Sequence, residues 1–107
     1  MRSLGNLKLL AAVVGMVATL HPVEVLAVFN SGNSIIENCR ARDQYCMGYV
    51  AALVDAMGAN RVICPPATVT QGQTMAIFSK YLDDHPELLH QSANYIALLA
   101  FSGVFPC

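Results

Sequence analysis

The sequence has few charged residues, and neither sign dominates. Lysine, arginine, aspartate and glutamate make up 12% of the 107 residues, and the formal net charge is −1. A protein that binds nucleic acid through its phosphates carries a basic patch or stripe, which this composition does not supply. We therefore expect no nucleic-acid partner.

The sequence also lacks an apolar segment long enough to cross a membrane as a helix, which needs about 20 residues. Residues 9–20 contain only apolar residues, Gly and Thr, and they follow a short stretch that carries Arg2 and Lys8 but no acid. This order is typical of a secretory signal peptide. Val25 and Ala27 suit positions −3 and −1 of a cleavage site, so we predict a cleaved signal over residues 1–27. The exported domain is then residues 28–107, with no membrane segment.

No Cys-x-x-Cys pair is present. The four cysteines are Cys39, Cys46, Cys64 and Cys107, separated by 6, 17 and 42 residues. Structural zinc sites are usually built from closely spaced cysteine pairs, so we expect no metal site. An even number of cysteines in a small exported domain favours two disulfides, which add stability that a small core does not supply.

The first two predicted helices follow from a cap and an apolar stripe. Ser34 and Glu37 have the spacing of a capping box, which predicts a short helix over about residues 35–41. The next helix has apolar residues at helical spacing, and Gly58 stands where the residue after a helix is often glycine. This stripe consists of Cys46, Tyr49, Val50, Leu53, Val54 and Met57.

A loop and two further helices complete the prediction. Residues 60–69 are expected to form a loop, because the Pro65-Pro66 pair cannot lie inside a helix. Thr70 and Gln73 form a second capping box, followed by an apolar face of Met75, Phe78, Tyr81 and Leu82. We expect Pro86 to begin the last helix, which would run to about Gly103.

No segment alternates between apolar and polar residues, so the predicted fold class is all-α: a small four-helix antiparallel bundle. This topology favours one pairing of the cysteines. Cys39 ends the first helix and Cys46 begins the second, at one end of the bundle. Cys64 and Cys107 would both lie at the opposite end. We therefore predict the disulfides Cys39–Cys46 and Cys64–Cys107.

Ionisable side chains offer little support for catalysis. His85 and His90 lie near Asp83, Asp84 and Glu87, but a solvated turn between helices explains this cluster more simply. A nucleophile with an adjacent base is required for covalent catalysis, and all four cysteines are assigned to disulfides. We predict neither an enzyme nor a bound cofactor.

Asp55 lies beside the apolar stripe of the second helix. It could be a functional carboxylate. A structural role, such as capping a neighbouring turn or pairing with Arg61, is the simpler interpretation.

An ordered set of short motifs resembles the Rap/Tai family, the immunity proteins against type VI secretion amidase effectors. The motifs extend from Cys39 to Cys107 and end on Phe-Pro-Cys; Ala52 departs from the glycine often found there. They are Cys46-Met-Gly-Tyr49, Val54-Asp55-Ala56, Cys64-Pro65, Val69-Thr70-x-Gly72-Gln73, Lys80-Tyr-Leu82, His85-Pro-Glu87 and Phe105-Pro-Cys107.

This resemblance implies a periplasmic helical protein, often a homodimer, that binds a peptidoglycan amidase effector and blocks its active-site groove. Two segments could make that contact: the loop at residues 60–69 and the turn at residues 83–90. The candidate binding residues are Asn60, Arg61, Pro65, Pro66, Thr68, Asp84, His85 and Glu87. The alternative function is a small periplasmic, disulfide-stapled helical chaperone or stress protein.

Overall fold

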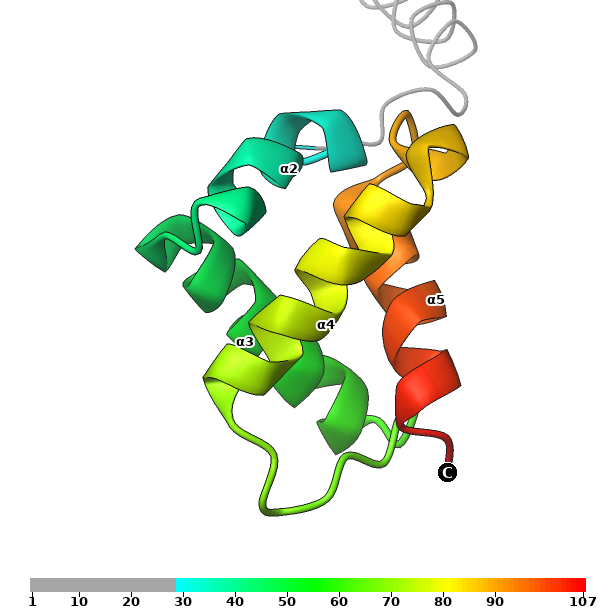
Figure 1. The fold of residues 1–107 in the computed structure, drawn as a ribbon. Coiled ribbons are helices and arrows are strands. Elements are labelled where there is room, and N and C mark those ends of the chain that lie inside the picture. Colours follow the sequence, from blue (N-terminus) through cyan, green and yellow to red (C-terminus); the bar gives the residue numbers. More distant parts are fainter. Residues whose placement is uncertain (1–28) are drawn as a thin grey trace, which may run out of the picture.

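The computed structural model describes residues 29–107 as four α-helices and one 3-10 turn (Figure 1). The elements are α2 (Gly32–Arg40), α3 (Gln44–Ala59), α4 (Gln71–Asp84), η1 (Pro86–Leu88) and α5 (Ala93–Val104). Within these residues the β pairing is limited to an isolated bridge between Ser31 and Ser92. The all-α prediction is confirmed. The predicted signal peptide, residues 1–27, lies outside the described residues.

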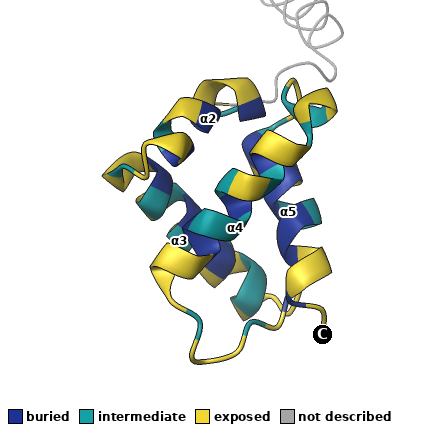
Figure 2. Cartoon of the chain, viewed as in Figure 1, coloured by how far each residue is buried: buried dark blue, intermediate teal, exposed yellow. Residues whose placement is uncertain are grey.

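Helix α4 is the central element, because its contact with each of α2, α3 and α5 is more extensive than any contact among those three. Helices α3, α4 and α5 alternate in direction, and α2 lies at the end where α3 begins (Figure 1). Their inward faces are buried and their outer faces are exposed (Figure 2). The largest fully buried side chains are Phe78, Phe101, Ile35, Ile63, Leu82, Ile96 and Val50.

Both predicted disulfides are present, Cys39–Cys46 and Cys64–Cys107. They lie at opposite ends of α3, as the predicted topology required, because Cys46 is in its first turn and Cys64 follows its end. Their sequence separations are 7 and 43 residues, so one closes a turn and the other ties the loop after α3 to the end of the chain. No helix within residues 29–107 has the length and apolar character to cross a membrane.

Helix α2 begins earlier than predicted, so the assignment of Ser34 as its cap is wrong. The cap is Ser31, whose hydroxyl accepts a hydrogen bond from the Ser34 amide at 3.2 Å. The Ser34 hydroxyl in turn accepts from the Ser31 amide at 2.9 Å. Gly32 makes this start possible, because a Cβ there would lie only 2.8 Å from Ile96 Cδ1 and 2.9 Å from the Leu89 Cα.

Helix α3 extends beyond both predicted ends. Asp43 caps its start by accepting from the Cys46 amide at 2.9 Å. Gly58 lies inside the helix, so its prediction as the residue after the helix is wrong. The left-handed conformation that such a glycine would adopt is found instead at Arg61, with φ of 56°.

The capping box that begins α4 is confirmed: the Gln73 amide donates to Thr70 Oγ1 at 3.1 Å, and the Thr70 amide donates to Gln73 Oε1 at 2.8 Å. The predicted single helix from Pro86 onwards is wrong. The 3-10 turn η1 ends at Leu88, and α5 begins at Ala93 behind its own cap, Ser92. The intervening residues bond instead to the start of α2: the Gly32 amide donates to the Gln91 carbonyl at 3.0 Å.

Candidate partner-binding surface

The loop at residues 60–69 is held firmly at its base. Cys64 is bonded to Cys107, and its amide donates to the Phe105 carbonyl at 2.9 Å. The Val62 amide donates to the Met57 carbonyl at 2.9 Å. Ile63 is only 1% exposed and belongs to the core. Residues 62–64 are therefore fixed by a covalent bond, hydrogen bonds and a buried side chain, and in the segment that follows the Val69 amide donates to the Pro66 carbonyl at 3.1 Å.

On either side of these anchors, the predicted binding residues of this loop face solvent. Asn60, Arg61, Pro66 and Thr68 are exposed, and Pro65 is half-buried. The structure adds two apolar side chains that the sequence did not single out: Val62 is 48% exposed and Val104 is 51% exposed. We call residues 60–69 together with residues 104–107 the loop end. An isolated apolar residue in a predicted loop carries no sequence signal of its exposure, so Val62 was missed.

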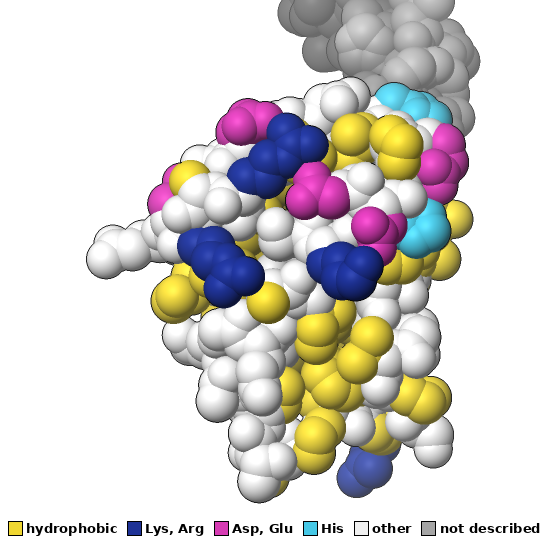
Figure 3. Space-filling view, in the orientation of Figure 1, with side chains coloured by type: hydrophobic (Ala, Val, Ile, Leu, Met, Phe, Trp, Pro, Cys, Tyr) yellow, Lys and Arg dark blue, Asp and Glu magenta, His cyan; other side chains and the backbone are white. Residues whose placement is uncertain are grey.

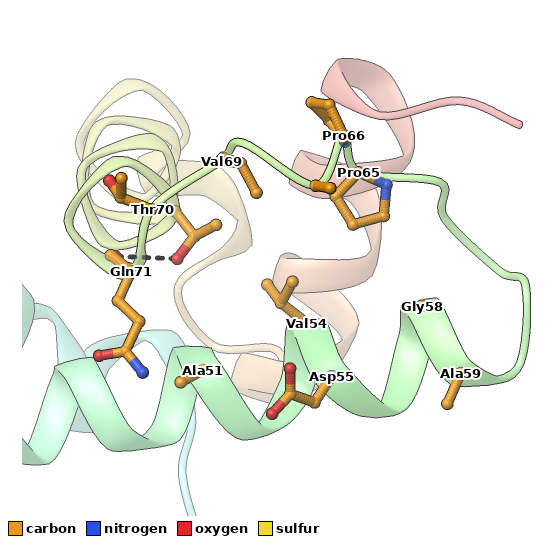
Figure 4. A pocket seen from close by; sticks show the side chains of 12 residues that line it. Ala51, Val54, Asp55, Gly58, Ala59, Pro65, Pro66, Val69, Thr70 and Gln71 are labelled. Carbon is orange, nitrogen blue, oxygen red and sulfur yellow. Dashed lines mark hydrogen bonds between the residues drawn. The ribbon is translucent and has the colours of Figure 1, made fainter.

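Two grooves flank the loop. The first, which we call the α3 groove, has a volume of about 370 Å³ and lies between α3, the loop and the start of α4. It is lined by Ala51, Val54, Asp55, Gly58, Ala59, Pro65, Pro66, Ala67, Val69, Thr70, Gln71 and Thr74 (Figure 4). The second, the α4 groove, has a volume of about 500 Å³ and is lined by Pro66, Thr68, Val69, Gln73, Ala76, Ile77 and Phe105. Pro66 and Val69 line both grooves, so the loop forms the wall between them.

The part of the molecule around the loop end is poor in charge. Between residues 44 and 79 the charged side chains are Asp55 and Arg61, and residues 91–107 contain none. Charged side chains gather instead in the upper part of the face in Figure 3, whereas hydrophobic and uncharged side chains dominate its lower part. Depletion of charge is typical of the centre of a protein–protein interface.

The second predicted segment, at residues 83–90, lies at the other end of α4. Helix α4 has 14 residues and therefore spans about 20 Å, so the structure does not bring residues 60–69 and residues 83–90 together. The charged side chains of residues 83–90 are paired with other side chains of the same molecule. Arg40 Nε donates to Asp83 Oδ1 at 2.9 Å, and Lys80 Nζ lies 2.6 Å from Asp84 Oδ2.

His85 and Glu87 are also internally paired. The His85 ring stacks on Tyr81 with centroids 4.0 Å apart, and its Nδ1 lies 2.9 Å from Glu87 Oε1. The pKa of Glu87 is lowered, first by its own backbone amide and then by His85. A turn whose ionisable groups already have partners fits a structural role better than a binding role.

Neither a free thiol nor a cluster of metal-binding side chains is found among residues 29–107. All four cysteines are in disulfides, so no thiol nucleophile is present among them. Within residues 29–107, no group of three or more His, Cys, Asp or Glu side chains converges on a point where a metal ion could bind. What the site offers is a stiff exposed loop between two grooves, which is suited to binding another protein.

Comparison with known proteins places the chain in one family. Residues 31–107 match the family described as Rap1a immunity proteins. The matched range includes every helix of residues 29–107. Neither the curated proteins nor the solved structures contain a match to this chain. The family match agrees with the resemblance drawn from the sequence motifs. The chain belongs to the Rap1a immunity protein family.

Proposed function

We propose that this chain is a periplasmic immunity protein that binds a type VI-secreted peptidoglycan amidase effector and inhibits it sterically, protecting the producing cell and its siblings. It has no catalytic activity of its own. Membership of an immunity protein family supports a role in binding an effector. The stiff, exposed loop at residues 60–69 is the structural observation that carries the proposal.

In this proposal the loop end enters the active-site groove of the effector. Ordering a flexible loop on binding costs about 0.5–1.5 kcal/mol for each immobilised side chain, so a loop that is already fixed binds more tightly. Its exposed residues include Arg61 and Val62, and the adjacent α4 groove is lined without any charged side chain. Contacts of this kind exclude water around a few buried anchors.

We further propose that residues 1–27 direct the chain to the periplasm and that the mature protein is a homodimer. The disulfides support the first point, since they form and persist in oxidising compartments. The second rests on the family resemblance of the sequence motifs. Light scattering on the purified mature chain measures its mass directly and tests the second point.

The function is tested by protection. Peptidoglycan amidase effectors encoded in the same genome are directed singly to the periplasm of a test bacterium, with and without this chain, and lysis is followed by turbidity. We expect rescue by the full chain against one effector. A matched version lacking residues 1–27 should fail to protect, because it stays in the cytoplasm.

Rescue should be accompanied by co-elution of the mature chain and the effector from a sizing column. Lysis in the presence of well-expressed, exported chain, for every effector tried, would contradict the proposal. In that case, binding of the mature chain to several unrelated unfolded proteins would support the chaperone alternative.

A further inference from the structure

Asp55 differs from every other acidic residue that the structure describes. Within residues 29–107 there are six acidic side chains, and five of them have a partner. Glu37 and Asp83 pair with Arg40, Asp84 with Lys80, and Glu87 with His85, while Asp43 accepts from the Cys46 amide and from Asn38. Asp55 has neither an ion pair nor a hydrogen bond with any of these residues.

The expected partner of Asp55 is not in place. Among the described residues there is no contact of hydrogen-bond or ion-pair length between Asp55 and Arg61, so the predicted pairing is wrong. Arg61 lies beyond the end of α3 and has a left-handed backbone, with φ of 56°. Asp55 therefore presents a free carboxylate.

That carboxylate lines the α3 groove and is the one ionisable side chain in its lining. Figure 4 shows Asp55 on α3 below the segment that carries Pro65 and Val69, with the Gln71 side chain extending from the start of α4 toward Ala51. The remaining walls are small or apolar on the side of α3 and the loop, and polar where Thr70, Gln71 and Thr74 of α4 and its cap line the groove. At about 370 Å³ the groove falls within the roughly 300–1,000 Å³ range of ligand pockets.

This combination fits a long side chain with an apolar stem and a cationic end. The stem of an arginine can lie along Val54, Pro65 and Val69, while its guanidinium meets a carboxylate in a two-bond fork. The Gln71 side chain adds a carbonyl oxygen that can accept from the same guanidinium. Asp55 is exposed in the free chain, so water hydrates its carboxylate there; a negatively charged or purely apolar group docked over it would displace that water without replacing its hydrogen bonds.

We propose that the α3 groove is the receptor for an arginine side chain of the protein partner, with Asp55 as the residue that selects it. The proposal rests on the proposed function, since the partner is the effector that the loop end contacts. Charge complementarity at one point of a sparsely charged surface gives specificity and fixes the register of docking.

The groove is first tested without any effector. The mature chain, isotope-labelled, is titrated with N-acetyl-arginine amide and, separately, with its uncharged citrulline analogue, and amide shifts are recorded by NMR. We expect saturable shifts at Asp55, Gly58 and Gln71 with the arginine compound alone. The Asp55→Asn variant should lose them. Equal shifts with both compounds, or no saturable shift in the groove, would overturn the assignment.

The second test uses the effector that passes the protection assay. Asp55→Asn should weaken its binding by at least about tenfold, as expected for a charge-assisted two-bond contact. Glu37→Gln, which removes one charge from α2 at the opposite end of α3, should bind as tightly as the parent chain. Unchanged binding by Asp55→Asn would rule out an arginine anchor in this complex. If no amidase binds the parent chain while the arginine compound still does, the proposed function fails and the groove assignment stands.

Discussion

The backbone amide of Cys64 donates a hydrogen bond to the carbonyl of Phe105, two residues before the cysteine to which Cys64 is bonded. Phe105 in turn stacks on Phe101, whose ring stacks on Phe78, with centroids 6.2 and 6.3 Å apart. The base of the loop is thus connected to the centre of the core through a row of aromatic rings.

Removing the two disulfides should cost different amounts of stability. The entropy of closing a loop grows with its length, so Cys64–Cys107 contributes about 4 kcal/mol and Cys39–Cys46 about 2 kcal/mol in the chain-entropy model. Urea unfolding of the Cys64→Ser/Cys107→Ser and Cys39→Ser/Cys46→Ser variants measures both. A larger loss from the second variant would contradict this account.

Substitutions at the neighbouring loop residues Ile63 and Val62 should have different effects: the first should lower stability and the second should weaken binding. Ile63→Ala empties a buried position and should lower the free energy of unfolding by about 2–5 kcal/mol. Val62→Ala trims an exposed side chain and should change it by less than about 0.5 kcal/mol. In the effector complex, Val62→Ala should weaken binding by about fivefold to tenfold, because the methyl groups would otherwise be buried. Calorimetry measures the affinity of the effector for the parent chain and for Val62→Ala. Equal affinities would mean that Val62 is not part of the contact with the effector.

Two helical glycines should respond in opposite directions to substitution by alanine. Gly48 lies inside α3 with open space where the alanine methyl group would stand, so Gly48→Ala should stabilise the protein by about 0.5–1 kcal/mol. Gly32→Ala should destabilise it by about 1–3 kcal/mol, because its Cβ would collide with the Leu89 backbone. Urea unfolding of each variant gives its midpoint and slope. At an unchanged slope, a higher midpoint means a more stable protein and a lower midpoint a less stable one.

Acid should weaken the cap of α3. The Cys46 amide, and then the Asn38 side chain, hold the pKa of Asp43 below its usual value. The folded state therefore binds fewer protons than the unfolded state between the lowered pKa and the ordinary value of about 3.9. The contribution is complete above that value and is lost as the pH falls through the lowered pKa.

Asp43→Ser provides the matched comparison, because serine keeps a capping oxygen without the charge. Urea unfolding between neutral and acid pH should show a steeper loss of stability for the parent chain than for this variant. Parallel curves would mean that Asp43 does not contribute to the acid sensitivity.

Features encoded within a few residues were predictable. The capping box from Thr70 to Gln73 lies inside four consecutive residues, and the cysteine pairing followed from the order of helices and loops. The loop at residues 60–69 was marked by Pro65 and Pro66.

The errors arose where distant segments meet. Gly32 begins α2 because it packs against Leu89 and Ile96, and the same contact interrupts the helix predicted from Pro86. Neither event leaves a local pattern. The α3 groove was equally invisible, since it depends on the backbone direction at Arg61 and on the approach of Pro65 to Gly58, 3.9 Å from the position of a Cβ there.

The uneven distribution of charge affects the rate at which a partner associates with this protein. Arg61 is the one charged side chain of the loop end, so a partner that docks there gains little from long-range attraction. Association should then proceed at about 10⁵–10⁶ M⁻¹s⁻¹ and change little with salt. Tight inhibition must then come from slow dissociation. If the proposed function holds, the protein protects by being present in excess before the effector arrives, because fast association does not supply the protection.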